Sequence, residues 1–197
     1  MKLNKNCYDG VIKWAKMHKI HVGDDYFIIG SYNHKTQNLS CRLSINEIND
    51  LINDKAANDT NYLEQIDSAA DKNKNNTPND FVCSICHSSI CISDNGNVYP
   101  CAGWQDYIVG NVKETPLKDI WDNSKKVHYL RGLRNHDFPK CIQCTDKEFC
   151  TICFVRNANE NPLGDPLEVN EYFCEIAKLN RKIVLEGKAK LLNSKCM

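Results

Sequence analysis

The stretch Cys141-Ile-Gln-Cys144-Thr-Asp-Lys-Glu-Phe-Cys150-Thr-Ile-Cys153 decides how this chain is interpreted. It places two Cys-x2-Cys pairs five residues apart, and we call residues 141–153 the knuckle. A further cysteine, Cys174, follows it. A Cys-x2-Cys turn lets two sulfurs converge on one metal centre, and iron–sulfur clusters need groups of thiolates. The knuckle therefore predicts a metal centre with cysteine ligands.

A second group of cysteines lies upstream, around a predicted β-hairpin. Cys83 and Cys86 form another Cys-x2-Cys pair, and Cys101 follows the predicted second strand. Between them, Asn95-Gly96 favours the positive φ values of a tight hairpin turn. The two groups hold more thiolates than one four-coordinate site can use, so the sequence predicts two metal centres.

The spacing also suggests how the ligands divide between the two centres. In two-cluster ferredoxins the last cysteine of such a run ligates the other cluster. The same logic predicts that Cys153 joins the hairpin group and that Cys174 completes the knuckle group. The expected ligands are Cys83, Cys86, Cys101 and Cys153 at the hairpin site, and Cys141, Cys144, Cys150 and Cys174 at the knuckle site.

Four of the twelve cysteines remain, and we interpret them as structural. A free cysteine behaves as a small buried hydrophobe. Cys91 alternates with Ile90 and Ile92 on the predicted hairpin strand, which favours a structural position. Whether Cys86 or Cys91 is the fourth hairpin ligand stays open at this point. The other three are Cys7, Cys41 and Cys196.

The composition narrows the class of protein. The 197 residues contain 25 Lys+Arg and 25 Asp+Glu, so the surface has no net field that would attract nucleic acid. The N-terminus lacks an export signal, and no apolar run reaches the length of a membrane span. We therefore expect a cytoplasmic protein without nucleic-acid or membrane partners. In that reducing compartment Cys-x2-Cys pairs indicate metal ligands before disulfides.

Residues 1–68 are predicted to form a helix, strand, helix unit. Apolar residues recur at helical spacing over Tyr8–Ala15, and Tyr26–Ile29 is a short apolar run typical of a strand. Ser44 and Glu47 have the spacing of a capping box, which starts a second helix. Such a unit is too small to close a core alone.

The rest of the chain divides into a linker and a second domain. Residues 69–80 have almost no apolar content and are predicted to be a linker, and residues 81–197 form the cysteine-rich domain. Within it, Thr115-Pro116 predicts a helix start with Thr as the cap and Pro at the first helical position. A last helix is expected around Cys174.

The cysteine pattern resembles the SPASM domain, an auxiliary-cluster extension at the C-terminus of many radical S-adenosylmethionine (radical SAM) enzymes. The resemblance runs from about Phe81 to Ile183. The residues that carry it are Cys83 to Cys101 in the form C-x12-G-x-V-Y-P-C, Gly110-Asn111-Val112, Ile120-Trp121, and the knuckle followed by Gly164-Asp165 and a late cysteine.

This resemblance implies an α+β fold in which a β-hairpin and helices surround two [4Fe–4S] clusters. It also implies that residues 1–68 are the C-terminal remnant of a radical SAM partial (β/α) barrel. The chain would support electron transfer or substrate anchoring in an enzyme that modifies a peptide or protein. The partners implied are a radical SAM core domain, the peptide or protein substrate and a reductant protein.

The sequence departs from the family pattern in three places. The pair Cys150 and Cys153 is one residue closer than the commonest family spacing, and Cys86 stands where many relatives have no cysteine. No Cys-x3-Cys-x2-Cys loop, which holds the S-adenosylmethionine-cleaving cluster in the family, occurs in the chain. The chain is therefore not expected to be active alone, and S-adenosylmethionine would enter only through a missing N-terminal domain or a partner.

One further residue bears on the substrate. Sulfatase-maturing members of the family carry an aspartate base directly after the cysteine that matches Cys101, and here that residue is Ala102. Formylglycine formation is therefore disfavoured, and a peptide is the better substrate hypothesis. The alternative from another class is a non-catalytic zinc-binding interaction module, because structural zinc also takes four thiolates.

Overall fold

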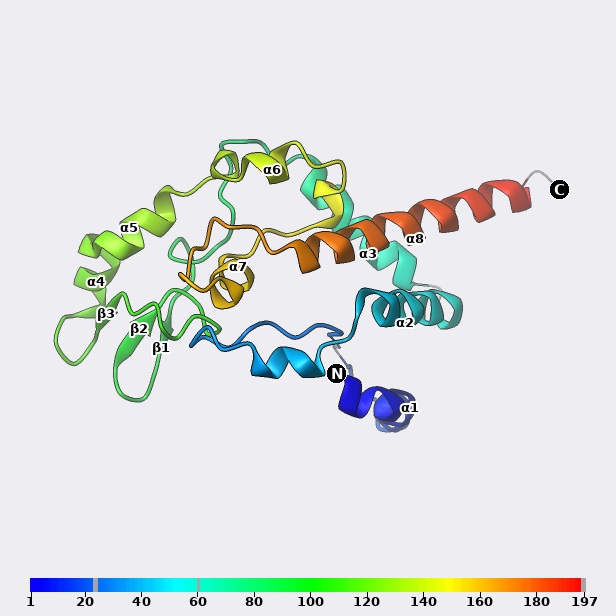
Figure 1. Cartoon of the computed structure of the whole chain (residues 1–197), viewed down its shortest axis with the longest axis horizontal. Coiled ribbons are helices and arrows are strands. Elements are labelled where there is room, and N and C mark those ends of the chain that lie inside the picture. The colour runs from blue at the N-terminus through cyan, green and yellow to red at the C-terminus, as the bar shows by residue number, and fades with distance from the viewer. Residues whose placement is uncertain (23–24, 60, 196–197) are drawn as a thin grey trace.

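The computed structural model describes residues 1–22, 25–59 and 61–195, without the side chains of residues 5 and 190–195. In this part of the chain the fold is α+β, with one small sheet at one end and the long helix α8 reaching towards the other (Figure 1). The α-helices are α1 (Tyr8–Met17), α2 (Ile45–Asn58), α3 (Tyr62–Lys74), α4 (Leu117–Asn123), α5 (Lys125–Gly132), α6 (Pro139–Ile142), α7 (Phe154–Glu160) and α8 (Glu171–Lys195). Short 3-10 helices are η1 (Lys2–Cys7), η2 (Gln37–Cys41), η3 (Asn135–Asp137) and η4 (Lys147–Phe149).

The sheet contains the predicted hairpin. Strands β1 (Cys91–Ile92), β2 (Asn97–Tyr99) and β3 (Gly110–Asn111) pair antiparallel in sequence order. Gly96 has a φ of 89°, and its N–H donates to the Ser93 carbonyl at 3.0 Å. A glycine adopts this left-handed conformation without steric cost, so the hairpin prediction is confirmed.

The sheet and the helices α4, α5 and α7 enclose the larger of two hydrophobic cores. At its centre, Trp104 is 1% exposed and stacks near Phe154, with ring centroids 6.4 Å apart. The helix expected from Thr115-Pro116 begins at Leu117, with Pro116 in the N-cap position. It stops at Ser124, whose backbone is extended, and resumes as α5.

The second core packs α2 against α8. The Ser44 hydroxyl accepts from the Glu47 amide at 3.3 Å, and the Glu47 carboxylate accepts from the Ser44 amide at 3.0 Å, so the predicted capping box is confirmed. Behind this cap, Ile48 and Ile52 are buried against α8. The ring of Phe27 meets Phe173 of α8 edge-on, with centroids 5.2 Å apart.

The strand predicted over Tyr26–Ile29 is wrong, because this segment pairs with side chains and with no strand. The Ile29 carbonyl accepts from Asn38 Nδ2 at 2.8 Å, and the Gly30 amide donates to Glu160 Oε1 at 3.1 Å. Side chains from η2 and α7 thus satisfy the backbone groups that a neighbouring strand would use. No strand occurs in the described residues of 1–68, so the barrel remnant is not seen.

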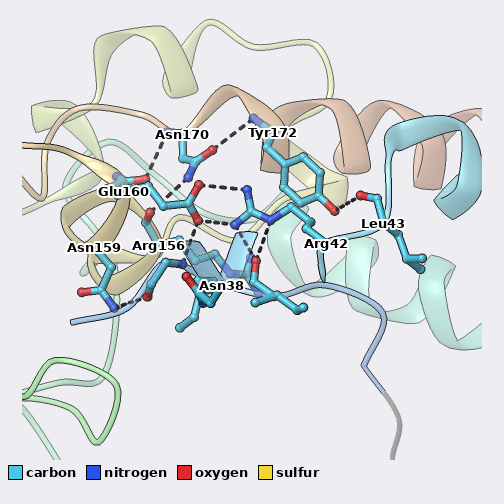
Figure 2. A network of polar contacts seen from close by, with 12 residues as sticks. Asn38, Arg42, Leu43, Arg156, Asn159, Glu160, Asn170 and Tyr172 are labelled. Atoms are coloured by element: carbon cyan, nitrogen blue, oxygen red, sulfur yellow. Dashed lines mark hydrogen bonds and ion pairs between the residues drawn. The ribbon is translucent and has the colours of Figure 1, made fainter. Parts of the chain in front are cut away.

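Arg42 and Glu160 form the centre of the polar network that joins this segment to α7 and α8 (Figure 2). Arg42 Nη1 donates to Glu160 Oε2 at 2.9 Å, and Arg42 Nε donates to the Ile28 carbonyl at 2.8 Å. The guanidinium lies over the ring of Tyr172, 4.1 Å from its centroid. The N-terminal segment is therefore tied to the cysteine-rich part of the chain through a nearly buried ion pair.

The first residues of the predicted linker 69–80 are helical, because α3 continues to Lys74. Ala70 is 1% exposed, and the helix packs against η4 and α8. The low apolar content of this stretch does not prevent a helix, because Ala70 is buried where α3 meets its neighbours. The three domain boundaries themselves stay predictions. Among the helices of the described residues, none is both long and apolar enough to cross a membrane.

Candidate iron–sulfur sites

The four cysteines predicted for the knuckle site line one cavity of about 360 Å³. Cys141 lies in α6, Cys144 and Cys150 lie on either side of η4, and Cys174 lies in the first turn of α8. Much of the remaining wall is apolar and comes from Phe81, Val82, Ile142, Ile152, Val169 and Ala177. The structure therefore brings together thiols that are 33 residues apart in sequence, counted from 141 to 174.

A buried carboxylate holds the knuckle against α8. Asp146 is 8% exposed, and its carboxylate is 3.6 Å from Nη1 of Arg181 in α8. The Asp146 amide donates to Cys144 Sγ at 3.4 Å. Hydrogen bonds to ligand sulfurs tune iron–sulfur centres. This contact thus places a backbone donor on a predicted ligand.

Asn73 of α3 supports the knuckle from the other side. Its Nδ2 donates to the carbonyl of Glu148 at 2.9 Å and to the carbonyl of Cys150 at 3.3 Å. One side chain thereby positions the backbone that carries a predicted ligand. The residue lies in the stretch expected to be a linker, and no sequence signal singled it out.

The knuckle thiols strongly influence one another. Burial, followed by the charges of Cys150 and Cys174, raises the pKa of Cys141 to about 12. Burial also raises the pKa of Cys150 to about 11, and Cys174 again contributes. Cys141 and Cys150 are therefore protonated at neutral pH, and binding a metal centre there must release protons. Thiolates this close repel one another unless a positively charged group lies between them.

The cavity fits a group larger than one ion. In the described ranges no three His, Cys, Asp or Glu side chains lie close enough to hold a single metal ion. A structural zinc ion draws four thiolates to about 2.3 Å from one point. The knuckle thiols instead surround a cavity of about 360 Å³. Four thiols are compatible with zinc as well as with an iron–sulfur cluster, and the cavity that they line has room for the larger group.

Among the predicted hairpin ligands, Cys86 is fully buried and has a φ of 57°. Its amide donates to the Ser89 carbonyl at 2.9 Å, and its carbonyl accepts from Arg131 Nε at 2.5 Å. Burial raises the pKa of Cys86 to about 11, while the positive charge of Arg131 opposes the rise and the Cys83 thiol adds to it.

The other predicted hairpin ligands pack on the core that contains Cys86. Cys83, Cys101 and Cys153 are partly buried against that core, whereas Cys91 does not belong to it. Cys91 instead lies in β1 opposite Tyr99. The structure therefore places Cys86, and not Cys91, in the same core as the other three. Cys7 is exposed, Cys41 ends η2 and Cys196 lies outside the described residues.

Residues 83–145 match the SPASM family, described as an iron–sulfur cluster-binding domain. These residues, about a third of the chain, are therefore similar to an iron–sulfur cluster-binding domain of the SPASM type. The matched range is shorter than the expected range from Phe81 to Ile183. It includes the predicted ligands Cys83, Cys86, Cys101, Cys141 and Cys144, and ends before the other three.

Among curated proteins, the chain is similar to an AdoMet-dependent heme synthase from Methanosarcina barkeri (strain Fusaro / DSM 804). The two are 33% identical over 81 residues, which are 41% of this chain and 22% of the relative. The match thus spans about a fifth of the relative's length. No solved structure gives a significant match to the chain.

Proposed function

We propose that this chain binds two auxiliary [4Fe–4S] clusters and serves as the auxiliary-cluster module of a radical SAM enzyme. The observation that carries the proposal is that Cys141, Cys144, Cys150 and Cys174 line one cavity. The similarity of residues 83–145 to the SPASM family supports it. These four side chains would hold the knuckle cluster. When bound, an iron–sulfur cluster supplies one-electron chemistry at a potential set by its surroundings.

The hairpin cluster would be held by Cys83, Cys86, Cys101 and Cys153. Its support is the shared core around Cys86 and the fact that three of these four residues fall within the SPASM match. Cys153 directly precedes α7, whose last residue is Glu160. The hairpin site would therefore depend on how α7 is anchored.

A radical SAM core would act with this module. The name of the relative states that it is AdoMet-dependent, and the present chain has no Cys-x3-Cys-x2-Cys loop. The S-adenosylmethionine site would thus be supplied by an upstream segment or a partner chain. The clusters of this chain would support electron transfer from a reductant protein or anchor the substrate.

We propose a peptide or protein as the first substrate class. Ala102 stands where the sulfatase-maturing relatives have their aspartate base, so formylglycine formation is disfavoured and another peptide modification is the better hypothesis. The name of the relative favours a second candidate, a haem-type tetrapyrrole. Titration of the reconstituted chain with an iron-free porphyrin, followed by tryptophan fluorescence, separates the two. Saturable quenching supports the tetrapyrrole, and its absence supports the peptide.

Iron and acid-labile sulfide should each reach about eight per chain after anaerobic reconstitution, since two four-iron clusters require that number. Inductively coupled plasma analysis and a sulfide assay measure both quantities. Protein purified without oxygen should also be brown. A plateau near four would show that only one site binds a cluster. Zinc in place of iron, with a colourless protein, would support the interaction module instead.

Incubated alone with S-adenosylmethionine and dithionite, the reconstituted chain should produce no 5′-deoxyadenosine above a no-protein blank. Reductive cleavage needs an iron with a vacant coordination position, whereas both proposed clusters have four cysteine ligands. Chromatography of the quenched reaction measures the product. Turnover by the isolated chain would show that one of the eight cysteines is not a ligand.

A further inference from the structure

Arg131 of α5 presents an unsatisfied hydrogen-bond donor beside the hairpin cysteines. Its Nε donates to the Cys86 carbonyl at 2.5 Å, and its guanidinium lies over the Trp121 ring, 4.4 Å from the centroid. Its Nη2 is buried and has no hydrogen-bond partner among the described residues. A buried donor on a charged group is costly to leave unpaired, so this nitrogen requires an explanation.

The shape of the guanidinium shows which side the unpaired donor faces. The group is planar and presents its N–H donors in a rigid fork, with Nε and Nη2 on the same edge. Because Nε is hydrogen-bonded to the Cys86 carbonyl, Nη2 lies on the edge of the guanidinium that faces the backbone at Cys86. The Trp121 ring covers a face of the guanidinium and therefore holds this orientation.

We propose that Arg131 donates a hydrogen bond from Nη2 to a sulfur of the hairpin cluster and thereby raises the reduction potential of that cluster. The inference rests on the proposed function, which places a cluster at Cys83, Cys86, Cys101 and Cys153. On reduction the oxidised cluster gains one electron from an external one-electron donor, and Arg131 keeps its proton throughout. Both a positive charge and a hydrogen bond to sulfur stabilise the more negative, reduced form.

Neighbouring basic groups do not offer the same contact. Arg134 uses its Nη1 on the carbonyls of Arg131 and Leu133, and its guanidinium lies over Phe81. His87 packs on the same Phe81 ring, with centroids 3.8 Å apart.

A redox titration of the reconstituted full chain, monitored by electron paramagnetic resonance, tests the proposal. The signal that is lost in Cys86→Ala identifies the hairpin cluster, and the knuckle signal serves as an internal reference. In Arg131→Gln the hairpin cluster should become harder to reduce, with at least a tenfold lower ratio of reduced to oxidised cluster at a given potential. For a one-electron couple this change is about 59 mV.

Two more variants complete the test. Arg131→Lys keeps the positive charge and loses the planar guanidinium, so it should lower the reduction potential of the hairpin cluster by less than Arg131→Gln does. If Arg131→Gln loses iron, the potential of Arg131→Lys tests the proposal instead. Lys126→Gln removes an exposed charge from the same helix and should leave the potential unchanged. Unchanged hairpin potentials in both Arg131 variants, with full iron, would overturn the role of Arg131. Lack of a hairpin cluster in the unmodified chain would instead overturn the proposed function.

Discussion

Alanine in place of Cys144 should lower the iron bound after reconstitution from about eight to about four per chain, because one of two four-iron clusters loses a ligand. Cys144 lines the knuckle cavity, and its sulfur accepts a hydrogen bond from the Asp146 amide. Without it, three thiols remain around a cavity that needs four. Iron analysis, the sulfide assay and the loss of one paramagnetic signal on reduction measure the effect.

The division of the ligands can be tested by combining variants. Cys174→Ala should cause the same loss as Cys144→Ala, and the two together should cause no further loss, because both residues line one cavity. Cys101→Ala should remove the other cluster, so that its combination with Cys144→Ala leaves almost no iron. Cys7→Ala is the matched control, since Cys7 is an exposed thiol away from both groups. Iron loss in Cys7→Ala equal to that in Cys144→Ala would contradict the assignment.

The knuckle cluster should also stabilise the fold around it. Its cysteines come from α6, the turns around η4 and α8, and the site is not preformed in the unfolded chain, so binding and folding are coupled. The metal-free protein keeps protonated thiols in this cavity, because burial raises the pKa values of Cys141 and Cys150. Iron incorporation therefore involves proton release and becomes easier as the pH rises.

Local signals in the sequence were sufficient for several elements of the fold. The capping box at Ser44 and Glu47 and the turn at Gly96 are each complete within a few residues, so the structure confirms both. The strand expected over Tyr26–Ile29 failed for the opposite reason. An apolar run is ambiguous until its hydrogen-bond partners are known, and here these are side chains of Asn38, Arg42 and Glu160.

The candidate sites show the same division between local and distant information. The Cys-x2-Cys pairs indicated which residues could be ligands, because two thiols at that spacing share a turn. The order of the cysteines predicted that Cys174 joins the knuckle group, but the shape of the cavity depends on how α8 packs against the knuckle, which the spacing does not give. Asn73 and Arg131 were missed because an asparagine in a polar stretch and an arginine in a helix are ordinary in sequence, and only their buried contacts distinguish them.

Arg42→Ala should lower the free energy of unfolding by about 3–5 kcal/mol, the usual cost of breaking a buried ion pair by removing one partner. The side chains of Arg42 and Glu160 are only 11% and 12% exposed. The variant leaves the Glu160 carboxylate without its cation and the Ile28 carbonyl without its donor. Urea unfolding followed by circular dichroism measures the change. Lys118→Ala is the control, because its pair with Asp122 is exposed and should leave the midpoint unchanged.

A double variant separates the ion pair from simple packing. Arg42→Met with Glu160→Leu removes both charges, so it should recover part of the stability that Arg42→Ala loses. If the double variant is less stable than Arg42→Ala, the network acts through its separate hydrogen bonds and not through the pair. Because Glu160 ends the helix that begins directly after Cys153, Arg42→Ala should also release iron from the hairpin site before the knuckle site. Iron loss from both sites at the same urea concentration would show that the Arg42–Glu160 pair does not stabilise the position of Cys153 through α7.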